Sequence, residues 1–214
     1  MAIILSIESG FSAPWGDDGT VPESPSAKNA GAVTFRASEE SLLRRPSMML
    51  GKRNMLMDKD LGHLQHAIRL AREAQQAGNL PVGAVISLNG EVAAEGKNSI
   101  WVPKISPGRH AEIEALEAVA PELWSRAGEM TLYTTLEPCM MCMGAILAHR
   151  IGRVVFGSSD AHGGASPVFG HMPPAFAQRL PALEWVGPAL PEECDELRET
   201  AFAILVRYKA HIWG

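Results

Sequence analysis

The sequence contains no long apolar segment. No run approaches the roughly 18 apolar residues that a membrane-spanning helix requires. The apolar stretch at residues 2–7 is too short for a secretory signal and lacks the basic flank of one. We therefore expect a cytoplasmic protein with no membrane association.

Cysteine is scarce as well, with only Cys139, Cys142 and Cys194 among 214 residues. Cys139 and Cys142 have the spacing of metal ligands, so Cys194 is left without a cysteine to pair with. The sequence therefore predicts no disulfide, as expected in a reducing compartment.

A surplus of basic residues is also missing. The chain carries 19 Lys and Arg against 24 Asp and Glu, and its formal net charge is −5 at pH 7. Since RNA binding draws on basic surface, this balance counts against RNA as the substrate. Two interpretations, a local basic patch and an ordinary solvated face, stay open for Arg150, Arg153, Arg207 and Lys209.

The amino-terminal part differs in composition from the rest. Residues 1–57 are crowded with Gly, Pro, Ser and Asp and show no sustained period. We predict a disordered extension over residues 1–57, followed by one folded domain over residues 58–214. Two interpretations of the extension stay open: it is a regulatory or docking arm, or the protein begins near Met55 or Met57.

The folded part shows clear helical and strand periods. A helix is expected from residue 58 to Gly78, because apolar residues recur on one helical face and glycine is a common helix end. Asn89-Gly90 is the strongest two-residue hairpin signal, and it joins two expected strands. The strands are expected at 81–88, 91–95, 130–136, 151–156 and 183–186, and a closing helix at 192–208.

Four residues carry the chemistry of this sequence. Glu112 follows His110 by two positions, and Cys139 and Cys142 form a Pro-Cys-x-x-Cys motif whose first cysteine lies 29 positions after the histidine. This order and spacing are typical of zinc deaminases that act on nucleobases. A Cys-x-x-Cys pair alone would also fit a redox pair or half of a structural zinc site.

Both halves of the motif are expected at helix starts. The strand at 130–136 leads to Pro138, a residue best tolerated at the first helical position, which places Cys139 and Cys142 on one face of a first turn. The positive end of a helix lowers thiol pKa values and so favours thiolate ligands. His110 begins the second helix, so we expect two helix starts to converge on one ion.

The number of ligands distinguishes two kinds of zinc site. Structural sites are closed by four protein ligands, whereas catalytic sites keep one position open for water or substrate. His110, Cys139 and Cys142 make three, and Cys194 lies in an acidic stretch that suits an ordinary, partly buried thiol. The pattern therefore predicts one catalytic Zn²⁺, with Glu112 as the general acid and base rather than a ligand.

Two loops are candidates for substrate contact. The loop at 96–108 contains Asn98 and delivers the chain to His110, so we expect it to lie over the metal. The loop at 157–174 is too long to be a mere connection, and such loops are usually functional.

The chain resembles the cytidine deaminase-like superfamily from residue 58 to about residue 209, and within it the bacterial tRNA adenosine deaminases. The matching stretches are LPVGAVI at 80–86, EGKN at 95–98, HAEIEAL at 110–116, TLEPCMMC at 135–142 and RIGRVVFGSSDAHGGA at 150–165. The resemblance implies an α/β fold, a three-layer α/β/α sandwich with a central mixed sheet, and a homodimer. It also implies one zinc on the three ligands named above, Glu112 as proton shuttle, and Asn98 as a hydrogen-bond partner of the target base.

Three hypotheses for the function stay open. The favoured one is a tRNA adenosine-to-inosine deaminase, which replaces the exocyclic amine of the base by oxygen and releases ammonia. The alternatives are a deaminase of a free base or nucleoside (guanine, adenine or cytosine type) and a non-catalytic zinc-binding partner subunit. The departures from the family fall at Ser99 and at the run 106–109, and Arg109 there is expected either to face the pocket or to turn onto the acidic surface.

Overall fold

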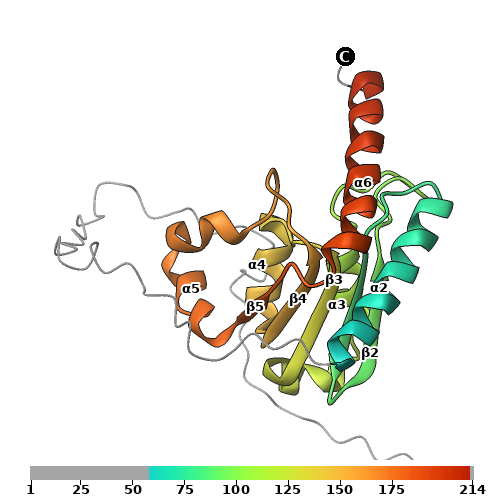
Figure 1. Cartoon of the computed structure of the whole chain (residues 1–214). Coiled ribbons are helices and arrows are strands. Elements are labelled where there is room, and N and C mark those ends of the chain that lie inside the picture. Colours follow the sequence, from blue (N-terminus) through green and yellow to red (C-terminus); the bar gives the residue numbers. More distant parts are fainter. Residues whose placement is uncertain (1–57, 213–214) are drawn as a thin grey trace, which may run out of the picture. The chain divides into compact units, whose positions relative to one another are not determined.

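A computed structural model describes residues 58–212, and the side chains as far as residue 207. The extension predicted for residues 1–57 lies outside the described residues. Within the described range, no helix is both long and apolar enough to cross a membrane. The elements in chain order are α2 (Asp58–Gln76), β1 (Gly83–Leu88), β2 (Glu91–Lys97), α3 (Ala111–Glu117), η1 (Pro121–Glu129), β3 (Met130–Leu136), α4 (Met140–His149), β4 (Arg153–Ser158), η2 (Ser166–His171), α5 (Pro174–Ala177), η3 (Leu180–Ala182), β5 (Glu184–Val186) and α6 (Pro191–Ile212) (Figure 1).

The strands form one mixed sheet of order β2-β1-β3-β4-β5. β1 pairs antiparallel with β2 and β3, whereas β3, β4 and β5 run parallel to one another. The hairpin between β1 and β2 is confirmed, because Asn89 and Gly90 both have positive φ, at 56° and 86°. The mixed sheet expected from the resemblance is likewise confirmed.

Helices cover both faces of this sheet (Figure 1). Alternate residues of a strand point to opposite faces, so Ile86 packs with α3 and α4 while Val85 packs with α2. The first turns of α6 join α2 on its face through Cys194 and Leu197. The three-layer α/β/α sandwich is therefore confirmed.

The close approach of α3 to β2 depends on Gly96. A Cβ atom at this position would collide with the backbone of Ala111 and Ala115, which lie in α3. The missing side chain lets the helix rest directly on the strand. The start of α3, and with it His110, thus takes its place from β2.

Several expected boundaries were wrong. β1 begins at Gly83 instead of residue 81, and β2 continues to Lys97 instead of ending at residue 95. β4 begins at Arg153 instead of residue 151, because Arg150 takes a left-handed conformation (φ 63°) and Ile151 still bonds back to the end of α4. Pro138 does not occupy the first helical position: α4 starts at Met140 with Cys139 as its N-cap. The closing helix continues to residue 212, and the segment at 157–174 contains η2 and leads directly into α5.

Candidate functional site

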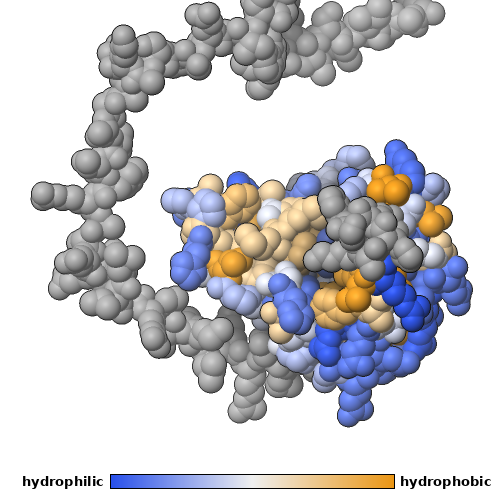
Figure 2. Space-filling model, turned by 90° about the horizontal axis from the view of Figure 1, so that it is seen from above, coloured by the Kyte–Doolittle hydropathy of each residue, from blue (hydrophilic) through white to orange (hydrophobic). Residues whose placement is uncertain are grey.

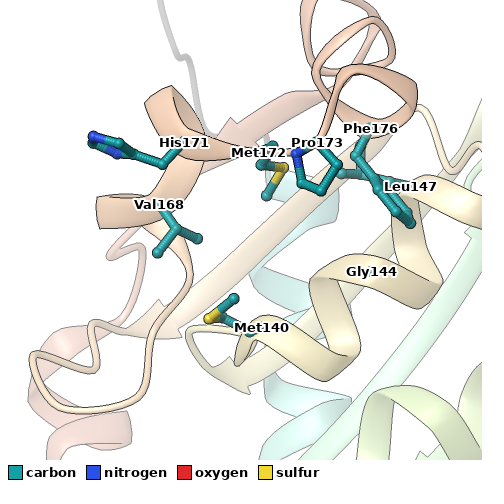
Figure 3. Close-up of a pocket in the computed structure, with 8 residues that line it drawn as sticks. All are labelled: Met140, Gly144, Leu147, Val168, His171, Met172, Pro173 and Phe176. Carbon is teal, nitrogen blue, oxygen red and sulfur yellow. The ribbon is translucent and has the colours of Figure 1, made fainter. Parts of the chain in front are cut away.

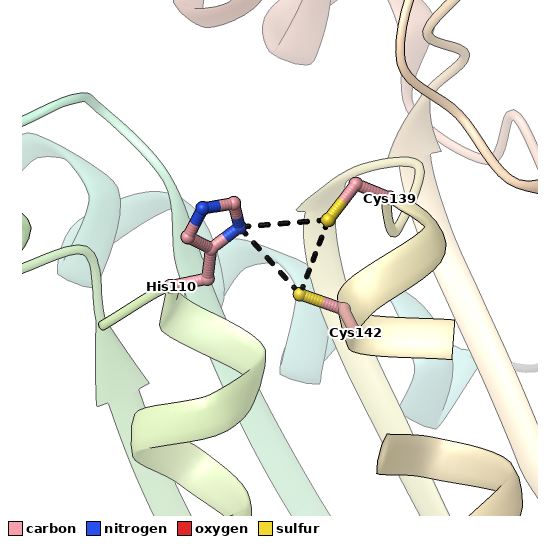
Figure 4. A group of neighbouring side chains, drawn as sticks. All are labelled: His110, Cys139 and Cys142. Atoms are coloured by element: carbon pink, nitrogen blue, oxygen red, sulfur yellow. Dashed lines mark hydrogen bonds between the residues drawn. The ribbon is translucent and has the colours of Figure 1, made fainter. Parts of the chain in front are cut away.

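The ends of two helices place the candidate metal ligands. His110 is the N-cap of α3 and Cys139 is the N-cap of α4, and both have extended backbone conformations. Cys142 lies in the first turn of α4, so its side chain points back toward the same end (Figure 4). The structure therefore brings together the three residues that the sequence motif singled out.

The three side chains form the one group of potential metal ligands found in the described part of the chain. The two sulfur atoms lie 3.6 Å apart, and Nδ1 of His110 lies 3.7 Å from Sγ of Cys139 and 3.6 Å from Sγ of Cys142. Tetrahedral zinc separates two thiolate sulfurs by about 3.8 Å and a sulfur from an imidazole nitrogen by about 3.5 Å. The donor set and its spacing fit zinc.

The thiols of this group differ in pKa because one hydrogen-bonds to the other. The bond with Cys142, more than the one with His110, lowers the pKa of Cys139 to about 4. The same bond, together with burial and nearby Glu112, raises the pKa of Cys142. Hydrogen bonding to Cys139 raises the pKa of His110. A metal requires two thiolates and a neutral imidazole, so binding must release the protons that this group holds.

Glu112 lies beside the three ligands and is almost fully buried, with 3% of its surface exposed. Its Oε1 accepts a hydrogen bond from Oγ1 of Thr134 at 3.3 Å, and its Oε2 accepts one from Sγ of Cys142 at 3.5 Å. Burial raises the pKa of this carboxyl group, the direction that suits a group which must both take up and release a proton.

The loop at 96–108 is held at both ends. Ser99 N donates to the carbonyl of Arg109 at 3.0 Å, which ties the start of the loop to the residue before His110. Farther along, Oδ1 of Asn79 accepts from the backbone nitrogens of Trp101 and Val102 at 2.9 and 3.0 Å. The buried Asn79 amide thus fixes the middle of the loop.

Asn98 lies at the start of this loop with 3% of its surface exposed. Its Oδ1 accepts from the backbone nitrogen of Ile100 at 3.4 Å, and its own backbone nitrogen donates to Val82 at 2.9 Å. Its amide nitrogen forms no hydrogen bond with another described residue. A donor on a well-positioned side chain is therefore available to a ligand.

Arg109 does not present a free cation. Its guanidinium forms two hydrogen bonds with the carboxylate of Glu114, at 2.9 and 2.7 Å. Of the two expected orientations, the structure thus has the one in which the arginine turns to an acidic partner. Arg153, one of the four residues considered above for a basic patch, is not free to bind phosphate either, because it forms ion pairs with Asp60 and Glu184.

Cys194 is separate from the site. It is fully buried between α2 and α6, and burial raises the pKa of its thiol to about 12. It is thus an ordinary thiol outside the site, as expected, but it is fully buried where the sequence indicated partial burial.

Sequence reasoning missed two residues that organise the site, Asn79 and Glu137. Both are buried, and both bind backbone groups of loops far along the chain. The sequence gives only weak indications of these roles. Asn79 follows the glycine after α2, and Glu137 is an acidic residue between the end of a buried strand and Pro138.

Three potential metal ligands at two helix starts, a buried carboxylate beside them and a mixed sheet below are the features of the zinc-dependent deaminases. Residues 57–158 match the family model of the cytidine and deoxycytidylate deaminase zinc-binding region. The tRNA-specific adenosine deaminase of Haemophilus influenzae is 39% identical over 141 residues, which are 65% of this chain and 80% of that protein. The chain belongs to this deaminase family, whose members are hydrolases acting on C–N bonds.

Solved structures agree with this assignment. One from a study of A-to-I editing by tRNA:A34 deaminases at the wobble position aligns with a TM-score of 0.53 and 29% identity, over 64% of this chain and 99% of that one. The guanine deaminase of Nitrosomonas europaea aligns with a TM-score of 0.53 over 69% of this chain and 86% of that one, at 20% identity, and shows the fold alone.

Proposed function

We propose that the protein is a cytoplasmic zinc-dependent deaminase that converts adenosine to inosine in tRNA. The observation that carries the zinc chemistry is the spacing of the ligand atoms, 3.6 to 3.7 Å, beside the buried Glu112. His110, Cys139 and Cys142 would hold one ion and leave its fourth position open.

The reaction consumes water and releases ammonia: the bond between a ring carbon and its exocyclic amine breaks, and that carbon gains a carbonyl oxygen. Bound zinc supplies a Lewis acid that makes water a nucleophile near neutral pH. Glu112 moves both water protons in turn. Thr134 holds its Oε1, so Oε2, on the side of Cys142, passes the first proton to the ring nitrogen and the second to the departing amine.

Several observations bear on the substrate. The relative from Haemophilus influenzae supports tRNA, and the available amide nitrogen of Asn98 supports recognition of a base edge. The acidic balance of the chain and the pairing of Arg109, Arg126, Arg153 and Arg198 with carboxylates favour the second candidate, a free base or nucleoside. Glu112 counts against a non-catalytic subunit, because loss of the proton shuttle would be the simplest way to lose turnover.

We also propose that the protein is a homodimer, with α4 at the interface. Apart from the proposed ligand Cys142, the ten residues of α4 include only one ionisable side chain, His149, and a helix apolar on all sides is normally buried. Met140 and Met141 are nevertheless 63% and 43% exposed. Apolar side chains gather on the side of the surface where α4 and α5 lie (Figure 2).

An apolar cavity of about 160 Å³ opens next to Met140 (Figure 3). It is lined by Met140, Gly144, Leu147, Val168, His171, Met172, Pro173 and Phe176. A second copy of this chain is the occupant that the family resemblance favours for this face.

The metal ligands are tested by removing one thiol at a time. We expect one zinc per chain in the wild-type protein, loss of zinc in Cys142→Ala, and full zinc in Cys194→Ala, which removes an equally buried thiol outside the group. Elemental analysis after dialysis measures this. Zinc retained by Cys142→Ala but lost by Cys194→Ala would contradict the assignment.

Glu112→Gln separates proton transfer from metal binding. The variant should keep its zinc and its fold, but its turnover should fall by the roughly 10² to 10⁴ that general acid–base groups contribute. Single-turnover ammonia release measures the loss. Near-normal turnover would show that another group moves the proton.

The substrate is tested with a panel of tRNA, an anticodon stem-loop, adenosine and free bases. We expect inosine to form in tRNA, and tRNA binding to weaken steeply as salt rises, because phosphate contacts release counterions. Asn98→Ala should abolish activity on every accepted substrate, while Arg109→Ala, whose guanidinium is already paired, serves as the control. Salt-independent deamination of a free base, without deamination of tRNA, would select the second candidate.

The dimer is tested by light scattering after size-exclusion chromatography. We expect a dimeric mass for the wild-type protein and a monomeric mass for Met140→Lys, because the interface would have to bury an unpaired charge. Val92→Lys, a charge on an exposed valine of β2, is the control. A monomeric wild-type protein would rule out the dimer.

A further inference from the structure

Glu137 is a buried carboxylate that forms no ion pair within the described part of the chain. It lies between the end of β3 and Cys139, with 6% of its surface exposed. A buried charge is costly unless hydrogen bonds compensate for it. Those bonds come from another segment: Oε2 accepts from the backbone nitrogen of Asp160 at 3.1 Å, and Oε1 accepts from the backbone nitrogen of Ser166 at 3.0 Å and from its hydroxyl group.

The segment that Glu137 holds, residues 160–166, is attached to the start of α4. Gly164 forms an isolated β-bridge with Cys139, and the nitrogen of Ala165 donates to the carbonyl of Pro138 at 3.0 Å. Gly164 has no space for a side chain, because a Cβ atom would collide with the carboxylate of Glu137. The carboxylate, the segment and the backbone of Cys139 therefore form one packed unit.

Among the three proposed ligands, Cys139 depends most on this unit. Cys142 is inside α4 and fully buried, so helix and core fix it. Cys139 precedes the helix, is only half-buried, and makes no capping hydrogen bond with its side chain. The bridge to Gly164 supplies the restraint that the helix does not, and Trp185 supports it from β5 through a 3.1 Å bond to the hydroxyl of Ser166.

We infer that Glu137 is a positioning residue of the metal site, which locks residues 160–166 onto the start of α4 and thereby sets the place of the Cys139 sulfur. This inference rests on the proposed metal site. Groups that orient metal ligands without touching the metal typically change metal affinity about 10- to 100-fold when they are removed.

Glu137→Gln is the first test, because it keeps the shape but turns an acceptor oxygen into a donor that faces another donor. Ser166→Ala is the second, milder variant, and it removes only the hydroxyl bond. Glu122→Gln, on an exposed residue of η1, is the matched control. Three quantities are measured: amide exchange in the metal-free proteins, zinc affinity by competition with a chelator, and the absorption spectrum of the cobalt-substituted forms.

We expect faster amide exchange at residues 160–166 in Glu137→Gln, zinc binding weakened about 10- to 100-fold, and a shifted cobalt spectrum. Ser166→Ala should change in the same direction by less, and Glu122→Gln should match the wild type. If exchange accelerates while zinc affinity and the cobalt spectrum stay unchanged, the inference is overturned and the proposed zinc site stands. If the wild-type protein and Glu122→Gln bind no zinc, the metal site itself fails and the inference fails with it.

Discussion

The central constraint on this molecule is that two helices must begin within hydrogen-bonding distance of each other. α3 and α4 lie in the same layer, and their N-caps are His110 and Cys139, whose Nδ1 and Sγ atoms are 3.7 Å apart. Each helix start adds a partial positive charge that favours thiolates at this point. The sheet, the tight packing at Gly96 and the loop contacts all serve to hold these two starts together.

Much of this arrangement was predictable because it depends on local sequence. Asn89-Gly90 determines the hairpin, the β-branched run before Pro138 determines β3, and the strict spacing of Cys139 and Cys142 places both near one helix end. The three-layer α/β/α arrangement was predicted from the resemblance to the cytidine deaminase-like superfamily. That the three ligand residues bind zinc, that Glu112 transfers protons and that Asn98 contacts the base stay predictions.

What the sequence did not reveal depends on partners that are distant along the chain. Asn79 binds the backbone of Val102, 23 positions away, and Glu137 binds Ser166, 29 positions away. Glu137 lies within the matching stretch 135–142, but neither that stretch nor the surroundings of Asn79 indicate which distant backbone groups the two residues bind, so only the folded chain brings out their roles. The exact starts of β4 and α4 were missed for a different reason, because a left-handed Arg150 and an N-cap at Cys139 each moved a boundary by two residues or fewer.

The direct contact between α3 and Gly96 has a consequence for how such a protein can change over generations. The position of His110 comes from a helix resting on strand backbone and from backbone bonds that Ser99, Ser106 and Gly108 form with residues 109 and 110, whereas residues 101–105 form no such bond. Insertions and replacements in the loop can therefore alter which molecule is recognised while the catalytic centre stays where it is. Substrate recognition and the position of His110 thus depend on different structural elements. A change in the loop can alter substrate preference while the proposed metal ligands keep their places.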